Sequence, residues 1–252
     1  MNREPNNLNS YTILAGFWVS LAAACGAQEL SSTQLPQNPT ANLPIKQVAT
    51  GVFELGLVRF DKKQKTVSFP AEVNMREGLI EYLMVGSAGK LHESLLRTEA
   101  EPGHIHVAML LVGAKGSPQK PSAPADAAVT NQPPWIDSAS LKNSSPLKGD
   151  AVSIWLSWKT AGGEKRCRAE EWVFNQQTQA PRAQGNWIYT GSMVINGTFM
   201  AQRERSIAAL VMDPFALINN PGRGHDNDEI WQVNSSVAPP DGTAVQITIK
   251  LE

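Results

Sequence analysis

Cysteine is scarce in this chain, which has only Cys25 and Cys167. Four-cysteine zinc sites and iron–sulfur clusters need about four thiolates, so the count alone excludes both kinds of centre. If Cys25 carries a lipid, as its context indicates below, Cys167 has no partner and no disulfide can form.

An excess of charge of one sign is also missing. The chain has 22 Lys and Arg against 23 Asp and Glu, a net charge of -1, which gives no electrostatic reason to expect nucleic acid or an anionic membrane as a partner. A hydrophobic content of 42% with 18% charged residues is ordinary for a globular protein that buries a core. The 252 residues suffice for one large domain or two small ones.

The N-terminal apolar run is too short for a comfortable membrane span. "YTILAGFWVSLAAAC", residues 11–25, follows Arg3 and is bounded by small residues. A positive residue, a short apolar stretch and small residues at its end form a secretory signal, which we assign to residues 1–24.

Two cleavage schemes compete at the end of this signal. "LAAAC" resembles a bacterial lipobox that would lipidate Cys25, although Ala22 stands where leucine is preferred. The alternative is ordinary cleavage after Ala24 or Ala27. We favour the lipoprotein, and Gly26 then favours the outer membrane over retention in the inner one.

Three regions follow the signal. Residues 25–47 are polar and proline-bearing without periodicity, which predicts a flexible tether. Residues 48–252 form the folded domain, and within it about 115–148 is a Pro- and Ser-rich excursion without a core pattern.

The first half of the domain has strand patterns joined by turns. Residues 51–61 and 66–74 flank the turn-forming "KKQK" as a hairpin, and residues 78–86 form another strand. A helix is expected from Glu101, because Pro102 suits the first helical position.

The second half is rich in strand patterns. Residues 151–160 alternate and pair back with 165–175, and strands flank Asn196-Gly197, a strong hairpin signal. "PFALINNP", residues 214–221, is a short helix in this interpretation, and 241–252 is a final strand. The predicted fold class is α+β, a mostly antiparallel β-sheet with one or two helices.

Three of the four histidines lie between Gly89 and Gly113. In a helix, His104 and His106 point about 200 degrees apart around the axis, whereas in a strand both rings face one side. We favour packing for His104 and keep His92, Glu93 and His106 as candidate metal ligands.

A second polar cluster is "GRGHDNDEIW", residues 222–231. His225, Asp226, Asp228 and Glu229 could offer ligands to a divalent metal, although the spacing departs from an EF-hand loop. The alternatives are carboxylates that cap the next element and meet Arg223, or an active-site loop shared with His225.

Tryptophan is abundant, with seven residues, of which six lie beyond residue 130. Trp155 and Trp158 cannot share a strand face, so at most one is core. Trp187 and Trp231 either pack in the core or contribute to a carbohydrate- or peptide-binding surface.

Several segments resemble one family. "LGLVRFDKKQKTVSFPAEVNMREGLIEYLMVGSAGKLHESLL" is similar to the core of YdjY-domain proteins, and "GSMVINGTFMAQ", "DPFALINNP" and "DNDEIW" are similar to its longer, extracytoplasmic members. The resemblance runs from about Val52 to the C-terminus and implies no established activity. Some members carry a ferredoxin-like label, which this chain does not support, because its folded part offers one cysteine.

The sequence names no reaction. It predicts an exported protein of the periplasm or outer membrane of a bacterium, acting as a non-catalytic binding or assembly module for a protein or small ligand of the cell envelope. No nucleic acid is expected as a partner, and the membrane is met only through a lipid at Cys25. The alternative is a metal-binding protein or metal-dependent enzyme that uses His92, Glu93 and His106 with the acidic loop 223–229.

Overall fold

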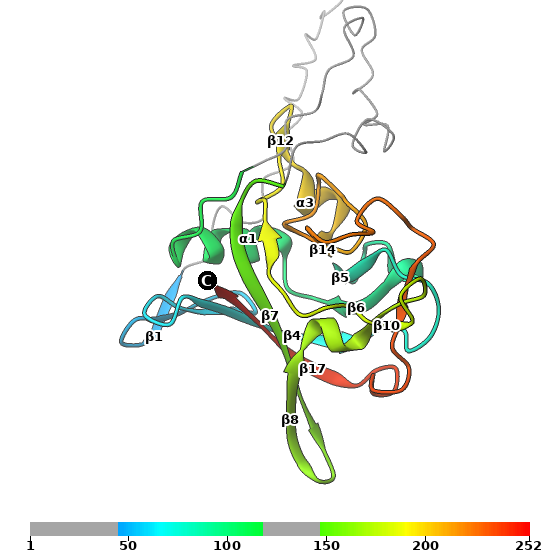
Figure 1. The fold of residues 1–252 in the computed structure, drawn as a ribbon. Coiled ribbons are helices and arrows are strands. Elements are labelled where there is room, and N and C mark those ends of the chain that lie inside the picture. The colour runs from blue at the N-terminus through cyan, green and yellow to red at the C-terminus, as the bar shows by residue number, and fades with distance from the viewer. Residues whose placement is uncertain (1–44, 118–146) are drawn as a thin grey trace, which may run out of the picture. The chain divides into compact units, whose positions relative to one another are not determined.

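A computed structural model describes residues 45–117 and 147–252 of the chain, which belong to one compact unit. Its main feature is a ring of eight hydrogen-bonded strands (Figure 1). In order around the ring these strands are β4 (Thr66–Val73), β17 (Ala244–Leu251), β7 (Asp150–Thr160), β11 (Trp187–Tyr189), β15 (Ile218–Asn219), β14 (Ser206–Ala209), β5 (Tyr82–Gly86) and β6 (Ser94–Thr98). The pairing of β6 with β4 closes the ring, so the strands form a barrel.

The α+β prediction is therefore wrong. Alternation with a period of two correctly indicated strands, but it carries no information about which strands become neighbours. The closing pairs, Glu72 with Arg97 and Val73 with Leu96, join segments whose pairing no local pattern predicts. A sheet that closes on itself needs no layer of helices to cover it, and the α-helices are short.

The barrel interior is filled by one face of each long strand. In β17 the buried residues are Val245, Ile247, Ile249 and Leu251, every second position. β4 alternates in the same way, and in β7 the apolar residues Val152, Ile154 and Leu156 are buried at every second position, which places one apolar face of each strand inside. Burial of this apolar area is the main source of stability for the ring.

Further strands extend the barrel at two places. β1 (Lys46–Ala49), β2 (Val52–Leu55) and β3 (Val58–Asp61) continue the sheet from β4. β8 (Gly163–Arg168) pairs with β7 alone, and Figure 1 shows this hairpin extending beyond the ring.

Two smaller sheets and short helices complete the described residues. β9 (Val173–Asn175), β10 (Ala180–Pro181) and β16 (Trp231–Val233) form a three-stranded sheet, and β12 (Val194–Ile195) pairs with β13 (Thr198–Phe199). The helical segments are η1 (Leu91–Glu93), α1 (Pro102–Leu111), η2 (Ala169–Trp172) and α3 (Met200–Glu204). In the ranges that the structure describes, no helix is long and apolar enough to cross a membrane.

Several local predictions are confirmed. β3 and β4 flank the expected turn, β7 pairs back with β8, and α1 begins at Pro102. The predicted strand 51–61 is instead divided by a turn at residues 56–57 into β2 and β3, which pair with each other. Asn196 and Gly197 have φ angles of 49° and 78°, as the tight turn between β12 and β13 requires.

The predicted helix at 214–221 is wrong. This segment holds a turn and the two-residue strand β15, because asparagine side chains take up backbone donors. Asn219 accepts a hydrogen bond from the backbone N–H of Asp213 (3.0 Å), and Asn220 accepts one from that of Gly222 (3.0 Å).

The proposed signal, the tether as far as residue 44 and Cys25 lie outside the described residues, as does most of the excursion, residues 118–146. The strand β1 begins at Lys46, two residues before the expected start of the domain. The ends of the excursion meet, because the Lys115 and Gly116 backbone N–H groups donate to the Asp150 carboxylate at 2.7 and 2.8 Å.

Candidate functional site

The histidines of the segment 89–113 do not converge. His92 lies in η1 with its side chain 81% exposed, 3.5 Å from the Glu93 carboxylate. His104 is buried in α1, and Gly56 packs so closely on its ring that an added Cβ would lie 2.7 Å from Nδ1. The packing role favoured for His104 agrees with this placement, and burial lowers the pKa of its imidazole.

His106 occupies a different environment on α1. Its Nδ1 is 2.7 Å from the Tyr189 hydroxyl, and its ring centroid is 4.7 Å from that of Phe199. Burial lowers the pKa of His106 and raises that of Tyr189. The pair is therefore a neutral hydrogen bond, and the helical setting separates it from His104, as expected for residues two apart in a helix.

Two of the predicted metal ligands, Glu93 and Asp228, act on the same partly buried carboxylate, that of Glu81. Glu93 and Asp228 both raise the pKa of Glu81, after the larger effect of its burial. Glu81 is a residue that sequence reasoning missed. His225 instead contacts the carbonyl of Gly222 at 2.8 Å through Nδ1.

No metal centre is assembled by these residues in the described ranges, 45–117 and 147–252, where no three His, Cys, Asp or Glu side chains lie close enough to hold an ion. Asp226 and Glu229 are exposed on the loop. Metal binding by the predicted set thus stays a prediction.

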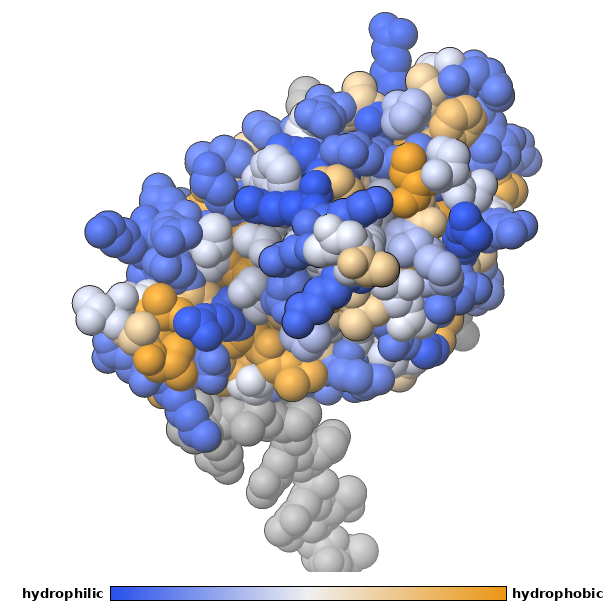
Figure 2. All heavy atoms as spheres, turned by 90° about the horizontal axis from the view of Figure 1, so that it is seen from below, coloured by the Kyte–Doolittle hydropathy of each residue, from blue (hydrophilic) through white to orange (hydrophobic). Residues whose placement is uncertain are grey.

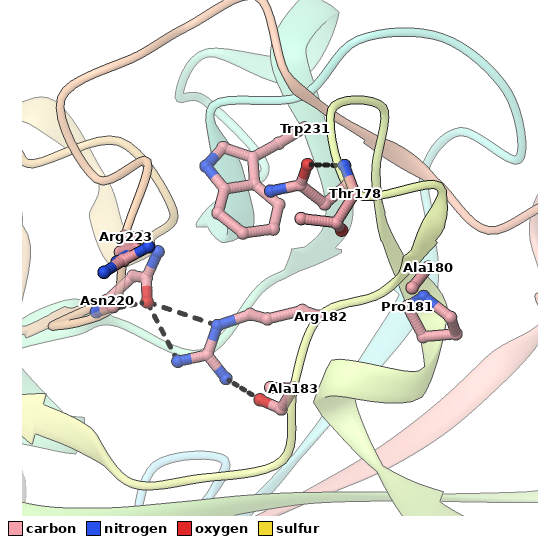
Figure 3. A pocket seen from close by; sticks show the side chains of 10 residues that line it. Thr178, Ala180, Pro181, Arg182, Ala183, Asn220, Arg223 and Trp231 are labelled. Carbon is pink, nitrogen blue, oxygen red and sulfur yellow. Dashed lines mark hydrogen bonds between the residues drawn. The ribbon is translucent and has the colours of Figure 1, made fainter.

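The small sheet carries a pocket of about 440 Å³ (Figure 3). Register places Ala180, Asn175 and Trp231 directly opposite one another on β10, β9 and β16, so their side chains share one face. Other walls come from the segment after β10 and the loop after β15. The pocket is lined by Asn175, Thr178, Ala180, Pro181, Arg182, Ala183, Asn220, Gly222, Arg223 and Trp231.

The Arg182 guanidinium pairs with a buried carboxylate, that of Glu170. Its side chain is 7% exposed and its Nη1 is 3.3 Å from Glu170, which is fully buried. Glu170 also accepts from Arg168 at 2.8 Å and from the Trp187 indole N–H at 3.2 Å. Burial lowers the pKa of Arg182 and Glu170 opposes this effect, so the guanidinium remains charged.

Asn220 fixes the direction of this guanidinium. Its Oδ1 accepts from Arg182 Nε at 3.2 Å and Nη2 at 2.9 Å, drawn as dashed lines in Figure 3. The amide nitrogen of Asn220 donates to the Leu210 carbonyl at 3.1 Å, which anchors the asparagine to β14's end. The Trp187 ring lies 4.4 Å from the guanidinium carbon and supports it from another side.

Arg223 is the second cation at the pocket. It is exposed, and within the described ranges its side chain has neither a hydrogen bond nor an ion pair. The next residue along the chain, Gly224, has a φ of +84° and lies against Ile230 and the Trp231 ring. Only glycine lets the loop pass this close, and the close passage brings Arg223 to the pocket.

Sequence reasoning found part of this pocket. Arg223 and Trp231 were singled out, the first as a partner for loop carboxylates and the second as core or ligand surface. Trp231 is 3% exposed and Trp187 is fully buried, so both are mainly packing residues, although Trp231 also lines the pocket. No sequence pattern marks the other polar residues of the site, because isolated residues of these types are common on protein surfaces. These residues are Arg182, Glu170, Asn175 and Asn220.

Comparison with known proteins gives one match. A family model described as the YdjY domain matches residues 58–250. No curated protein and no solved structure matches this chain.

Proposed function

The chain belongs to the YdjY-domain family, and we propose that it is an exported, non-catalytic binding protein of the cell envelope whose ligand is a small anion. One observation carries the proposal: Arg182 and Arg223 converge on a pocket that no carboxylate lines. We name this site the arginine pocket.

The charge balance around the arginine pocket favours an anion. Glu170, a buried carboxylate, pairs with the guanidinium groups of Arg168 and Arg182. The neighbouring Glu171 carboxylate accepts a hydrogen bond from the Arg168 backbone N–H. Arg223 has no ion pair among the described residues, so the positive charge left without a partner at the pocket is that of Arg223. Since a charge partly removed from water is stabilised by a counter-charge, a bound anion would offset the cost of burying Arg182.

The lining also favours binding over catalysis. Its side chains are those of Asn, Thr, Ala, Pro, Arg and Trp, without His, Cys, Lys, Asp or Glu. General acid–base catalysis needs a group that titrates near the working pH, and an arginine does not. The set can orient and neutralise a ligand.

One face of the molecule gives no support for assembly with a large partner (Figure 2). On the face seen in Figure 2, hydrophilic residues predominate and hydrophobic residues form separate groups rather than one broad patch. Stable protein interfaces contain a contiguous apolar core, which this face does not offer among the described residues.

Export rests on the sequence alone. The apolar run that ends at Cys25, followed by a polar tether, supports a lipid-anchored protein of the periplasm or outer membrane. The folded domain would then meet its ligand outside the cytoplasm.

Thermal melting with simple anions tests the proposal. Sodium acetate and inorganic phosphate, each titrated at constant ionic strength, should include at least one anion that raises the melting temperature saturably. A ligand at ten times its dissociation constant stabilises the native state by about 1.4 kcal/mol.

Three variants separate specific binding from salt effects. Arg223→Ala should abolish the shift, whereas Arg203→Ala, which removes an exposed arginine of α3, should keep it. Asn175→Asp should also abolish it, since the acid keeps the turn's acceptor oxygen but brings a negative charge to the pocket. Equal shifts in all four proteins would contradict the proposal.

A further inference from the structure

The arginine pocket is larger than a simple inorganic anion requires. Its volume of about 440 Å³ falls within the range typical of small-molecule sites, roughly 300 to 1,000 Å³. An ion of a few atoms would fill the part next to the two guanidinium groups and leave the rest to water. The ligand therefore has an uncharged body as well as an anionic group.

The hydrogen-bonding groups at the pocket are mostly donors. Asn175 Oδ1 already accepts from the backbone N–H groups of Gln177 and Thr178 at 2.9 and 3.0 Å, which leaves its amide nitrogen for a ligand. Four of the five N–H groups of Arg182 already have partners: two face Asn220 Oδ1, one the Ala183 carbonyl and one the Glu170 carboxylate. One N–H group remains for a ligand. Among the described residues Arg223 has no acceptor, so its donors favour a ligand that brings oxygen acceptors.

The remaining walls are flat and apolar. Trp231 presents a ring surface and Ala180, on the same face of the small sheet, presents a methyl group; Figure 3 shows the Trp231 ring on the side of the pocket opposite Arg182. Thr178, an exposed residue at the rim, adds one hydroxyl that can donate or accept. A body with C–H faces and hydroxyl edges satisfies both kinds of wall.

The lining argues against a ligand that carries its own positive charge. An amino acid would bring an ammonium group, which needs a carboxylate or several acceptors, and the pocket offers neither. The carbonyl and amide oxygens next to Arg182 are already used.

From this donor set, size and wall chemistry we propose that the ligand is a hydroxylated carboxylic acid of about monosaccharide size, such as a sugar acid, an inference that rests on the proposed function. The carboxylate pairs with Arg223 and the last N–H of Arg182. The ring lies against Trp231 and Ala180, and a ring hydroxyl meets Thr178 and the Asn175 amide.

Titration of the full folded protein with D-glucuronate, D-glucose and acetate tests this assignment. Glucuronate should bind at least about tenfold more tightly than acetate, since it adds the contacts of the body. Glucose should show no binding at the same concentrations, since it lacks the carboxylate. Saturation-transfer NMR should detect contact through the ring protons of glucuronate.

Two variants assign the contacts. Arg223→Ala should remove glucuronate and acetate binding alike. Thr178→Val keeps the side-chain shape at an exposed position and removes the hydroxyl, so it should weaken glucuronate binding severalfold and leave acetate unchanged.

The possible outcomes separate the sugar-acid assignment from the proposed anion-binding function. Acetate or phosphate binding that depends on Arg223, with glucuronate no tighter than acetate or unaffected by Thr178→Val, would overturn the sugar-acid assignment and spare the anion pocket. If none of the three anions binds, or if Arg223→Ala binds as wild type does, both are overturned.

Discussion

Arg182 and His106 are both basic side chains removed from water, but their partners give them opposite charge states. Glu170 supplies Arg182 with a counter-charge, so the guanidinium stays protonated. His106 faces the neutral Tyr189 hydroxyl, so burial favours the uncharged imidazole. The partner of a buried basic side chain therefore determines whether that side chain is charged, and only a charged one can bind an anion.

Acid should destabilise the protein through His106. Its pKa in the folded state lies below the usual 6.5, so the unfolded chain takes up a proton before the folded one does. The stability from the neutral ring is complete above pH 6.5 and is lost as the pH falls through the lowered pKa. Denaturant unfolding of wild type and His106→Gln on both sides of that pH measures the effect.

Glutamine can keep a hydrogen bond to Tyr189 and does not titrate, so the loss of stability on acidification should shrink in this variant. It should not vanish, since His104 also has a lowered pKa. An identical pH dependence in both proteins would refute the assignment to His106.

The metal hypothesis also belongs at the residue scale. If His92, Glu93 and the acidic loop hold a divalent ion, zinc should raise the melting temperature of the wild type and not that of His92→Ala. His225→Ala tests the loop in the same assay. Equal zinc responses in the three proteins would reject this site.

Single residues show where sequence reasoning succeeds for the site. Arg223 and Trp231 stood out because they flank a Gly-rich polar loop with unusual composition. Arg182 and Glu170 lie twelve positions apart, in segments that look like ordinary strand and turn. Their pairing depends on how η2 and β10 pack, and nothing local to either residue encodes it.

At the scale of elements, the loop from Gly222 to Trp231 forms one wall of the pocket, and Gly224 sets its path. Gly224→Ala should destabilise the fold by more than a backbone penalty, because the new Cβ would also collide with Ile230. Gly51→Ala provides the matched control: its φ is +79° and no atom lies within 4 Å of an added Cβ.

We expect Gly51→Ala to cost about 1 to 2 kcal/mol of unfolding free energy, the price of a left-handed alanine, and Gly224→Ala to cost more. Anion binding should weaken in Gly224→Ala alone, because Arg223 moves with the loop. Chemical denaturation and the anion titration measure the two effects. Equal costs with unchanged binding would mean that the loop adapts without moving the arginine.

Elements with local signals were predicted well. The hairpins at Asn196-Gly197 and at β7–β8 follow from turn residues and alternation, and α1 follows from Pro102. The segment 214–221 is a helix in the sequence-based prediction and a turn with a short strand in the structure. The side chains of Asn219 and Asn220 bind backbone groups instead and form a turn.

At the scale of the whole molecule, the closed ring rests on pairs between distant segments. β17, at the C-terminus, lies between β4 and β7, and β6 returns to β4. Alternation sets which face of each strand is buried but not the order of the strands, so the sequence predicted the strands and missed the barrel.

Export is tested on the whole chain. Expressed with its own leader in a bacterial host, the wild type should fractionate with membranes, and Cys25→Ser should release the protein or leave it unprocessed. Cell fractionation and N-terminal sequencing check both outcomes. Wild-type protein recovered wholly soluble with an N-terminus at Gln28 would defeat the lipid anchor and leave secretion standing.

The central claim is that Arg182 and Arg223 together hold an anion, and arginine side-chain NMR tests it most directly. The Nε–Hε signals of both residues, assigned with Arg182→Lys and Arg223→Lys, are followed while glucuronate or acetate is added at constant ionic strength. Both signals should shift along one saturable curve while that of Arg203 stays in place. Shifts that are equal for all exposed arginines, or that leave Arg182 and Arg223 unmoved, would contradict the account.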